Sequence, residues 1–244
     1  MILDFITPQW PAPATIRALS TLRTGGVSVG AYESLNLGDH VGDDPAQVQE
    51  NRRRLRTAQS LPGEPRWLTQ VHGTHVADLD GALSDLSADA AVTRQRGVVC
   101  AILTADCLPV LFTDATGECV AAAHAGWRGL AGGVLEATVA AMRVKPSRLL
   151  AWLGPAIGPQ RFEVGPEVRE IFVRNDPTAA AGFTAGTGTR HMANLGMLAR
   201  LQLMALGLDG IFGGDECTHS QPQRFFSHRR DGRSGRQATL IWKT

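Results

Sequence analysis

No part of the 244-residue sequence is apolar over enough residues to cross a membrane. A membrane-spanning helix needs about 20 predominantly apolar residues. The most apolar segments, 97–112 and 119–124, are shorter than that, and Asp106 interrupts the first. The first five residues, MILDF, have neither the basic segment nor the long apolar core of a secretory signal. These absences predict a cytoplasmic protein with no membrane partner.

Cysteine is also scarce. The four cysteines are Cys100, Cys107, Cys119 and Cys217, and no two of them form a CxxC pair. In a reducing compartment such residues are thiols rather than disulfides. Cys100 and Cys119 lie inside apolar segments and are expected in the core.

An excess of charge of either sign is missing as well. The chain has 24 basic and 23 acidic residues, a net charge of +1, so its total charge predicts neither a nucleic acid nor an anionic membrane as partner. The basic run 52–54 is interpreted as a solvated helix face. The segment 229–232, with sequence RRDG, is interpreted as a hairpin turn rather than a binding site.

Strand-like and helix-like segments alternate along the chain without repeats or low-complexity linkers. A helix is expected from Pro45 to about residue 58, with Asp43 or Asp44 as its N-cap. The other expected helices cover 129–142, 164–173 and 195–206, and the expected strands cover 66–71, 97–103, 109–112, 119–123, 149–153, 210–213 and 238–242. This order predicts one α+β domain, residues 1–244, with a sheet core and outer helices.

Three metal-binding residue types stand at the ends of expected strands. His72, Cys107 and His124 each follow or end an apolar run and lie beside Gly or Ala. Strand ends that share one edge bring distant side chains together. Two imidazoles and a thiolate suit Zn²⁺ and leave a fourth position for water or substrate, as in catalytic zinc sites. The three residues are therefore a candidate catalytic zinc centre, although their spacing alone is weak evidence, because a single buried cysteine or histidine more often has a structural role.

Further residues near these strand ends have alternative interpretations. Asp106 precedes Cys107 and is expected to orient an imidazole. His75 is a competing ligand, although an exposed loop position suits it better. Cys217 follows an expected strand and could approach the site, but a structural role is favoured.

Polar groups beside glycine turns are candidates for binding phosphate. Arg23 begins the segment RTGGVS, whose flexible amides can approach an anion, and Asn36 lies in a tight loop. Arg128, in GWRG, comes just before an expected helix and could bind an oxyanion. For each of the three, a structural turn remains an equal alternative.

Several motifs together resemble one known family. Gln70-Val71-His72-Gly73, 104–110 (TADCLPV) and 122–129 (AAHAGWRG) are similar to motifs of the laccase-domain family of purine nucleoside phosphorylases and adenosine deaminases. Bacterial members are also called polyphenol oxidases and peptidoglycan editing factor. The segments 23–26, 34–38, 154–158 and 215–218 extend the resemblance over nearly the whole chain.

The resemblance implies a four-layer α/β/β/α fold with zinc on His72, Cys107 and His124. It also implies purine nucleosides and phosphate as substrates, through phosphorolysis of adenosine, inosine and methylthioadenosine and deamination of adenosine. One position departs from the family, because His228 stands where tyrosine is more common. This departure is expected to alter the pocket rim and not the metal ligands.

Three other functions compete with the phosphorylase. A copper oxidase is suggested by the older family name, but seven histidines with no His-x-His pair are too few for a multicopper centre. In a cysteine hydrolase or editing enzyme acting on cell-wall precursors, Cys107 would be the nucleophile and His124 or His72 the base. A structural zinc module would need His75 or Cys217 as fourth ligand. A monomer and a small homo-oligomer are both compatible with the sequence.

Overall fold

Two β-sheets lie face to face in the computed structural model, which describes residues 3–81 and 86–244. Met1 and Ile2, part of the N-terminal segment considered above, lie outside the described residues. The five-stranded sheet has the order β1-β2-β14-β6-β3, and the six-stranded sheet has the order β13-β9-β7-β8-β5-β4. Their strands are β1 (Phe5–Ile6), β2 (Ile16–Thr21), β3 (Arg66–Trp67), β4 (Val76–Asp78), β5 (Ala90–Thr93), β6 (Val99–Thr104), β7 (Leu108–Asp114), β8 (Val120–Ala125), β9 (Leu149–Leu153), β13 (Gly210–Gly213) and β14 (Gln237–Lys243).

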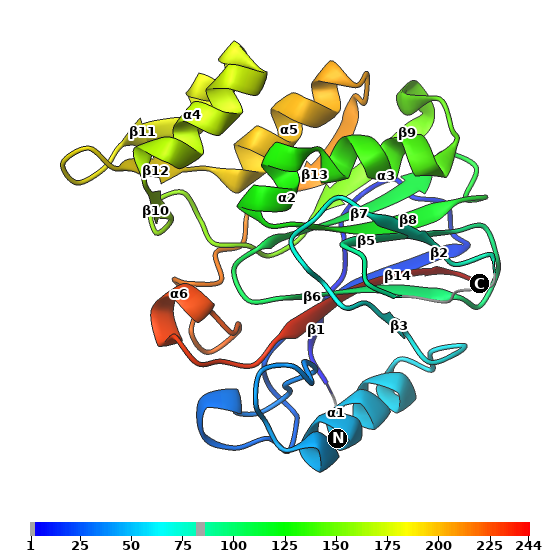
Figure 1. Ribbon diagram of the computed structural model, residues 1–244. Helices are drawn as coiled ribbons and strands as arrows, with labels where there is room; N and C mark the ends of the chain where they lie inside the picture. The colour runs from blue at the N-terminus through cyan, green and yellow to red at the C-terminus, as the bar shows by residue number, and fades with distance from the viewer. Residues whose placement is uncertain (1–2, 82–85) are drawn as a thin grey trace.

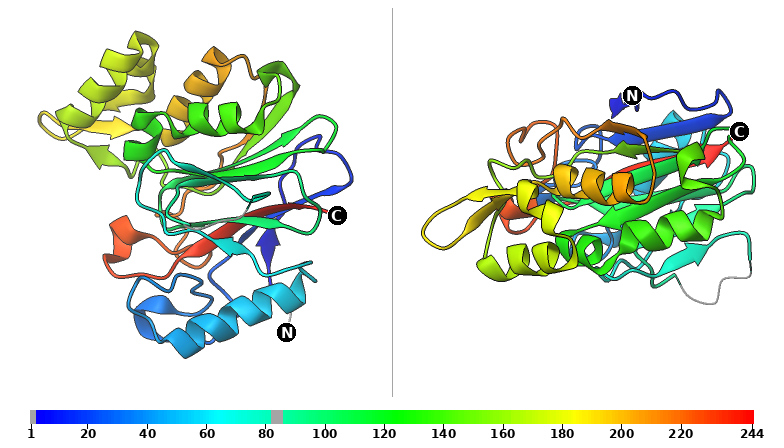
Figure 2. Two further views of the ribbon diagram at one scale, coloured as in Figure 1. Left: turned by 45° about the vertical axis from the view of Figure 1, so that its right-hand side comes forward. Right: turned by 90° about the horizontal axis from the view of Figure 1, so that it is seen from above.

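Helices cover the outer face of each sheet (Figure 1). Below the five-stranded sheet lies α1 (Pro45–Ala58), and above the six-stranded sheet lie α2 (Trp127–Gly132), α3 (Val134–Met142) and α5 (Leu195–Ala205). Beside them, α4 (Pro166–Asn175) packs on a small sheet of β10 (Glu163–Val164), β12 (His191–Ala193) and β11 (Phe183–Ala185). Figure 2 shows the β11–β12 hairpin projecting from one end of the molecule. The four-layer α/β/β/α prediction is confirmed.

Three apolar clusters fill the three spaces between these layers. In β6, Val99, Ala101 and Leu103 pack toward α1, whereas Cys100 and Ile102 pack toward the other sheet. Both faces of this strand are therefore buried, which explains its continuous apolar sequence. The third cluster joins the six-stranded sheet to α3 and α5. Cys100 and Cys119 are buried, as predicted.

The helix boundaries follow local capping signals. Asp44 is the N-cap of α1, where its carboxylate accepts a 2.9 Å hydrogen bond from the amide of Ala46, and Pro45 is the first helical residue. The expected helix 129–142 is two helices, because Gly133 adopts φ +97°, a left-handed conformation that ends α2. The interpretation of the basic run as solvated is wrong for Arg52. Its side chain is 17% exposed, lies over the Trp67 ring and pairs with Asp39 at 3.2 Å.

Several strand and turn predictions need correction. The expected strand 66–71 pairs only over Arg66–Trp67, followed by an isolated bridge between Thr69 and Ser87. Strand β2, which lies between β1 and β14, was not predicted. The expected hairpin turn at 229–232 is instead the short helix α6 (His228–Asp231). Ser227 caps this turn by accepting a hydrogen bond from the Arg230 amide.

Over the described residues, no helix combines the length and apolarity required to cross a membrane.

Candidate metal centre

The side chains of His72, Cys107 and His124 converge at one edge of the two sheets. His124 is on β8 opposite Pro109 of β7, and Cys107 lies in the turn that joins β6 to β7. The loop after Thr69 carries His72. Their ligand atoms all lie within 4.8 Å of one another, and Cys107 Sγ is 3.8 Å from His72 Nε2. The predicted convergence of these three side chains is confirmed.

Left-handed backbone conformations turn two of these segments toward the centre. His72 has φ +60° and Asp106, next to Cys107, has φ +94°. Such conformations are unfavourable for residues other than glycine and persist where surrounding contacts hold them. In the His72 loop, three hydrogen bonds hold this conformation: the amides of Val71, His72 and Gly73 all donate to the Asp89 carboxylate, at 2.6–3.1 Å.

Asp89 also binds the second imidazole. Its Oδ1 lies 2.8 Å from Nδ1 of His124, and both residues are buried. A carboxylate on Nδ1 fixes the ring orientation and leaves Nε2 as the ligand atom. Burial opposes ionisation of Asp89, but hydrogen bonds from His124 and from the loop amides outweigh it and lower the pKa of the carboxyl.

Asp106 does not have the predicted orienting role. Its carboxylate accepts hydrogen bonds from the Thr218 hydroxyl and from the Arg229 amide, both at 2.6 Å. Asp106 therefore ties the turn that carries Cys107 to the C-terminal segment, and Asp89 is the residue that contacts an imidazole. Asp89 was not predicted as a site residue, although it is a single carboxylate in the apolar run Ala88-Asp89-Ala90-Ala91-Val92.

The thiol of Cys107 and the buried imidazole of His124 each favour the charged form of the other. Burial opposes ionisation of Cys107, but the charge of His124 and hydrogen bonds with both histidines outweigh it and lower the pKa of the thiol. Burial likewise disfavours imidazolium, yet the Cys107 thiolate and Asp89 raise the pKa of His124. A cluster that favours thiolate is suited to bind a cation such as Zn²⁺.

The spacing of the donor atoms also fits zinc. A tetrahedral ion with Zn–S of about 2.3 Å and Zn–N of about 2.0 Å holds its donors about 3.5 Å apart. The 3.8 Å between Cys107 Sγ and His72 Nε2 is close to this spacing, whereas the full group, whose atoms lie within 4.8 Å of one another, must contract around the ion. Within the residues that the structure describes, no fourth His, Cys, Asp or Glu joins the group. His75 is exposed, and Cys217 accepts a hydrogen bond from the Gly158 amide. The three residues therefore make an open ligand set.

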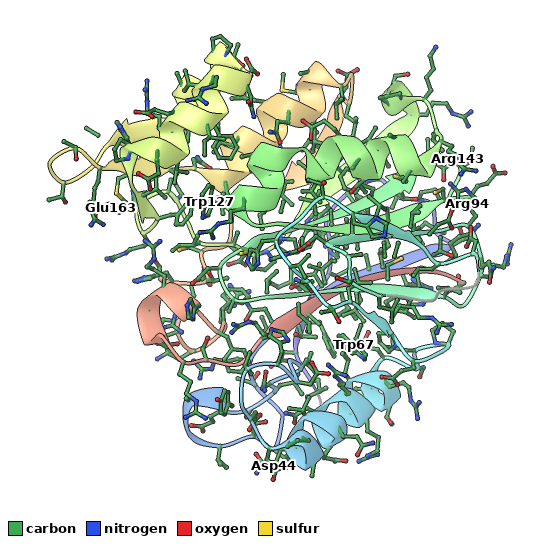
Figure 3. The ribbon with its side chains drawn as sticks, viewed as in Figure 1. Asp44, Trp67, Arg94, Trp127, Arg143 and Glu163 are labelled. Carbon is green, nitrogen blue, oxygen red and sulfur yellow. The ribbon has the colours of Figure 1, made fainter. Side chains whose placement is uncertain are left out.

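A pocket of about 180 Å³ opens beside His72 and Cys107. Trp127, at the start of α2, and Phe162 give it aromatic walls (Figure 3 labels Trp127). The Arg128 guanidinium lies 4.5 Å from the centroid of the Trp127 ring, and that of Arg229 lies 5.1 Å from that of Phe162. Two of the three candidate ligands, His72 and Cys107, thus share one pocket with aromatic surfaces and two cations.

Of the three predicted phosphate contacts, only Arg128 lines this pocket. The Arg23 guanidinium donates to the carbonyl oxygens of Glu33 and Pro222, so its donors are used within the fold. Asn36 is fully buried and bonds to Gly38, Asp43 and the Arg236 amide. Arg229, which was expected in a hairpin turn and not in a binding site, lines the pocket. A larger depression of about 780 Å³ on α1 has mixed arginine and carboxylate walls and lacks the metal group.

Comparisons with known proteins agree with this architecture. Residues 17–244 match the family described as multi-copper polyphenol oxidoreductase laccase. The chain is 52% identical to purine nucleoside phosphorylase YfiH of Escherichia coli strain K12 over 97% of its length and 98% of the relative's. It is 53% identical to purine nucleoside phosphorylase PA4543 of Pseudomonas aeruginosa, with 98% of each chain covered.

Solved structures share the fold. Protein NMB0706 of Neisseria meningitidis superposes with a TM-score of 0.93 at 50% identity, covering 98% of this chain and 99% of that one. YlmD of Geobacillus stearothermophilus superposes with a TM-score of 0.88 at 32% identity, covering 99% and 98%.

Proposed function

The chain belongs to the multi-copper polyphenol oxidoreductase laccase family, and we propose that it is a zinc-dependent purine nucleoside phosphorylase that also deaminates adenosine and accepts methylthioadenosine. Relatives about half identical to it over nearly their whole length are named purine nucleoside phosphorylases. The observation that carries the proposal is the open His72–Cys107–His124 ligand set beside a pocket with aromatic and cationic walls.

Different pocket residues suit the purine and the phosphate. A planar purine packs well against aromatic surfaces, which Trp127 and Phe162 supply. Phosphate needs cationic donors, which Arg128 and Arg229 supply. When zinc is bound by His72, Cys107 and His124, it supplies positive charge that neutralises anionic oxygens. Positioning and charge neutralisation are the main catalytic contributions available here.

The types of donor atom in this group also help to decide between zinc and copper. One thiolate and two imidazoles suit zinc and could bind a single copper ion. The residues with described positions contain one such three-residue group, whereas a multicopper oxidase needs further imidazoles. We therefore infer zinc chemistry and no oxygen consumption by the zinc-loaded protein.

The direct test combines metal analysis with nucleoside assays. We expect about one zinc per chain and phosphate-dependent release of purine from inosine, adenosine and methylthioadenosine. Cys107→Ala is expected to lose both metal and turnover, whereas Cys217→Ala, a matched thiol outside the ligand group, keeps both. Full turnover by metal-free Cys107→Ala protein would rule the proposal out.

One observation favours a second candidate, a cysteine hydrolase or editing enzyme. Cys107, His124 and Asp89 form a thiolate–imidazole–carboxylate series of the kind used in nucleophilic catalysis. In that enzyme, an alkylating reagent would modify Cys107 in the metal-loaded protein and abolish activity. Under the phosphorylase proposal, bound zinc protects the thiolate and activity persists.

The cytoplasm is the compartment proposed for this enzyme. All four cysteines are free in the structure. Free thiols persist in a reducing compartment. Fractionation of cells followed by immunodetection tests this location.

A further inference from the structure

We propose that His228 is the general acid that protonates the purine as it leaves, an inference that rests on the phosphorylase function proposed above. His228 lines the same pocket as His72 and Cys107. It has no part in the metal group.

The reaction requires a proton donor. As phosphate oxygen bonds to the anomeric carbon, the glycosidic C–N bond breaks and its electron pair stays on the purine. A purine anion is a poor leaving group, so a positioned acid accelerates the step by about 10²–10⁴-fold. The acid gives its proton to the purine ring nitrogen. The sugar phosphate formed from HPO₄²⁻ then releases one proton, which restores the acid and balances the reaction.

The other groups around the pocket cannot fill this role. His72 and Cys107 belong to the metal ligand set. Arginine does not release its proton near neutral pH, which excludes Arg128 and Arg229. Both Asp106 oxygens accept hydrogen bonds, from the Thr218 hydroxyl and the Arg229 amide, and therefore act as acceptors.

An imidazole meets the chemical requirement. Histidine is the side chain that most often acts as a general acid in enzymes, because its ring can give and regain a proton. The charged and titratable groups that face it across the pocket are Arg128 and Arg229, the Asp106 carboxylate, and the ligands His72 and Cys107. In the described chain, the His228 ring makes no hydrogen bond or ion pair, so its N–H groups are available to a ligand.

The backbone on both sides of His228 is held in place. Ser227 is fully buried and caps the turn, with its hydroxyl accepting from the Arg230 amide at 3.2 Å. The Arg229 amide is fixed to Asp106, one residue from Cys107, and its guanidinium donates to the Glu163 carbonyl at 2.8 Å. In the view of Figures 1 and 3, α6 lies below the labelled residues Glu163 and Trp127. The ring is therefore carried by a rigid turn anchored next to the metal centre.

The test compares two leaving groups in one variant. Inosine needs a proton to release its purine, whereas 7-methylinosine carries a positive purine that leaves as a neutral molecule. With His228→Gln, we expect kcat/KM for phosphorolysis of inosine to fall about 10²-fold or more. The same quantity for 7-methylinosine should change less than about 3-fold, and zinc content should stay at the wild-type value. His191→Gln, an imidazole on β12 outside the pocket, is the matched control and should leave both substrates unaffected.

The outcomes separate this inference from the function on which it rests. Equal losses on both nucleosides would overturn the acid role and make His228 a structural or binding residue. A wild-type protein that releases no purine from either nucleoside would overturn the phosphorylase proposal itself. His228→Tyr keeps a ring with a donor, and we expect it to recover part of the inosine activity. Thermal unfolding checks that both variants are folded. If they are, a kcat/KM for inosine that is no higher in His228→Tyr than in His228→Gln would also contradict the proposal.

Discussion

The carboxylate of Asp89 joins two of the three candidate metal ligands, because its Oδ1 lies 2.8 Å from His124 Nδ1 and also accepts the His72 amide at 2.9 Å. One buried side chain thus sets the ring orientation of one ligand and the backbone position of the other. Cys107 is positioned separately, by the turn between β6 and β7. The geometry of the centre therefore depends on a residue that does not itself belong to the ligand group.

Replacing Asp89 by Asn should weaken metal binding. The amide of Asn cannot accept all the hydrogen bonds that the carboxylate accepts, and loss of a carboxylate behind a ligand histidine typically costs about 10–100-fold in metal affinity. Chelator competition measures this affinity. Asp78→Asn, a partly exposed carboxylate paired with Arg94, is the control and should bind zinc as the wild type does. Unchanged zinc affinity in Asp89→Asn would show that the carboxylate does not orient the ligands.

Gly126 is predicted to tolerate no side chain. A Cβ at this position would lie 2.9 Å from Cys107 Sγ and 3.0 Å from His72 Cδ2, closer than ordinary van der Waals contact. Gly126→Ala should therefore displace two ligands and lower the zinc content of purified protein. Gly196→Ala is the matched control, since its Cβ would come no nearer than 3.5 Å to a neighbouring atom. Full zinc occupancy in Gly126→Ala, measured by elemental analysis, would contradict this packing argument.

Much of this arrangement was accessible from the sequence. Apolar runs identified β6, β8 and β9 because both faces of each strand are buried. The convergence of the three candidate ligands could be predicted because metal-binding residue types stand at strand ends within motifs that resemble those of a known family. The boundary between α2 and α3 was missed, since the left-handed conformation of Gly133 interrupts an otherwise helical apolar pattern.

Long-range contacts account for most of what was missed. Asp89 and His124 are 35 positions apart, so no local pattern pairs them. The sequence favours Asp106 as the orienting carboxylate because it adjoins Cys107, yet its partners Thr218 and Arg229 lie more than 100 positions away. Strand β2 pairs with β14 from the other end of the chain, and its sequence, IRALST, lacks a clear apolar run.

Alkylation of Cys107 should report the metal directly. Because the pKa of this thiol is lowered, the metal-free protein holds thiolate at pH values where an ordinary thiol, with a pKa of about 8.5, is protonated. Its reaction with iodoacetamide should be fast at pH 7 and slow as the pH falls through the lowered pKa. Zinc should suppress the reaction. The measurement uses a Cys217→Ala background and mass spectrometry, and an alkylation rate that zinc leaves unchanged would argue against coordination by Cys107.

The turn between β7 and β8 should make the fold sensitive to acid through Asp114. This buried carboxylate accepts hydrogen bonds from the Cys119 amide at 2.7 Å, from the Thr116 amide at 3.0 Å and from the Thr116 hydroxyl. Burial opposes its ionisation, but these hydrogen bonds outweigh burial and lower the pKa of Asp114. The carboxylate therefore contributes stability above the pKa of the unfolded chain, and this contribution is lost as the pH falls through the lowered pKa of the folded protein.

Asp114→Asn is accordingly expected to lower the free energy of unfolding by about 2 kcal/mol at pH 7, since hydrogen bonds to a charged group contribute about 1.5–3 kcal/mol. The difference from the wild type should shrink as the pH falls below about 4, because the wild-type carboxyl then becomes protonated as well. Urea unfolding at a series of pH values measures both effects. Asp209→Asn changes an exposed turn carboxylate with no hydrogen bond in the described chain, and it should leave the stability unchanged at every pH. A constant deficit for Asp114→Asn from pH 7 to pH 3 would mean that the amide disrupts packing and that the ionised carboxylate is not the source of the stability.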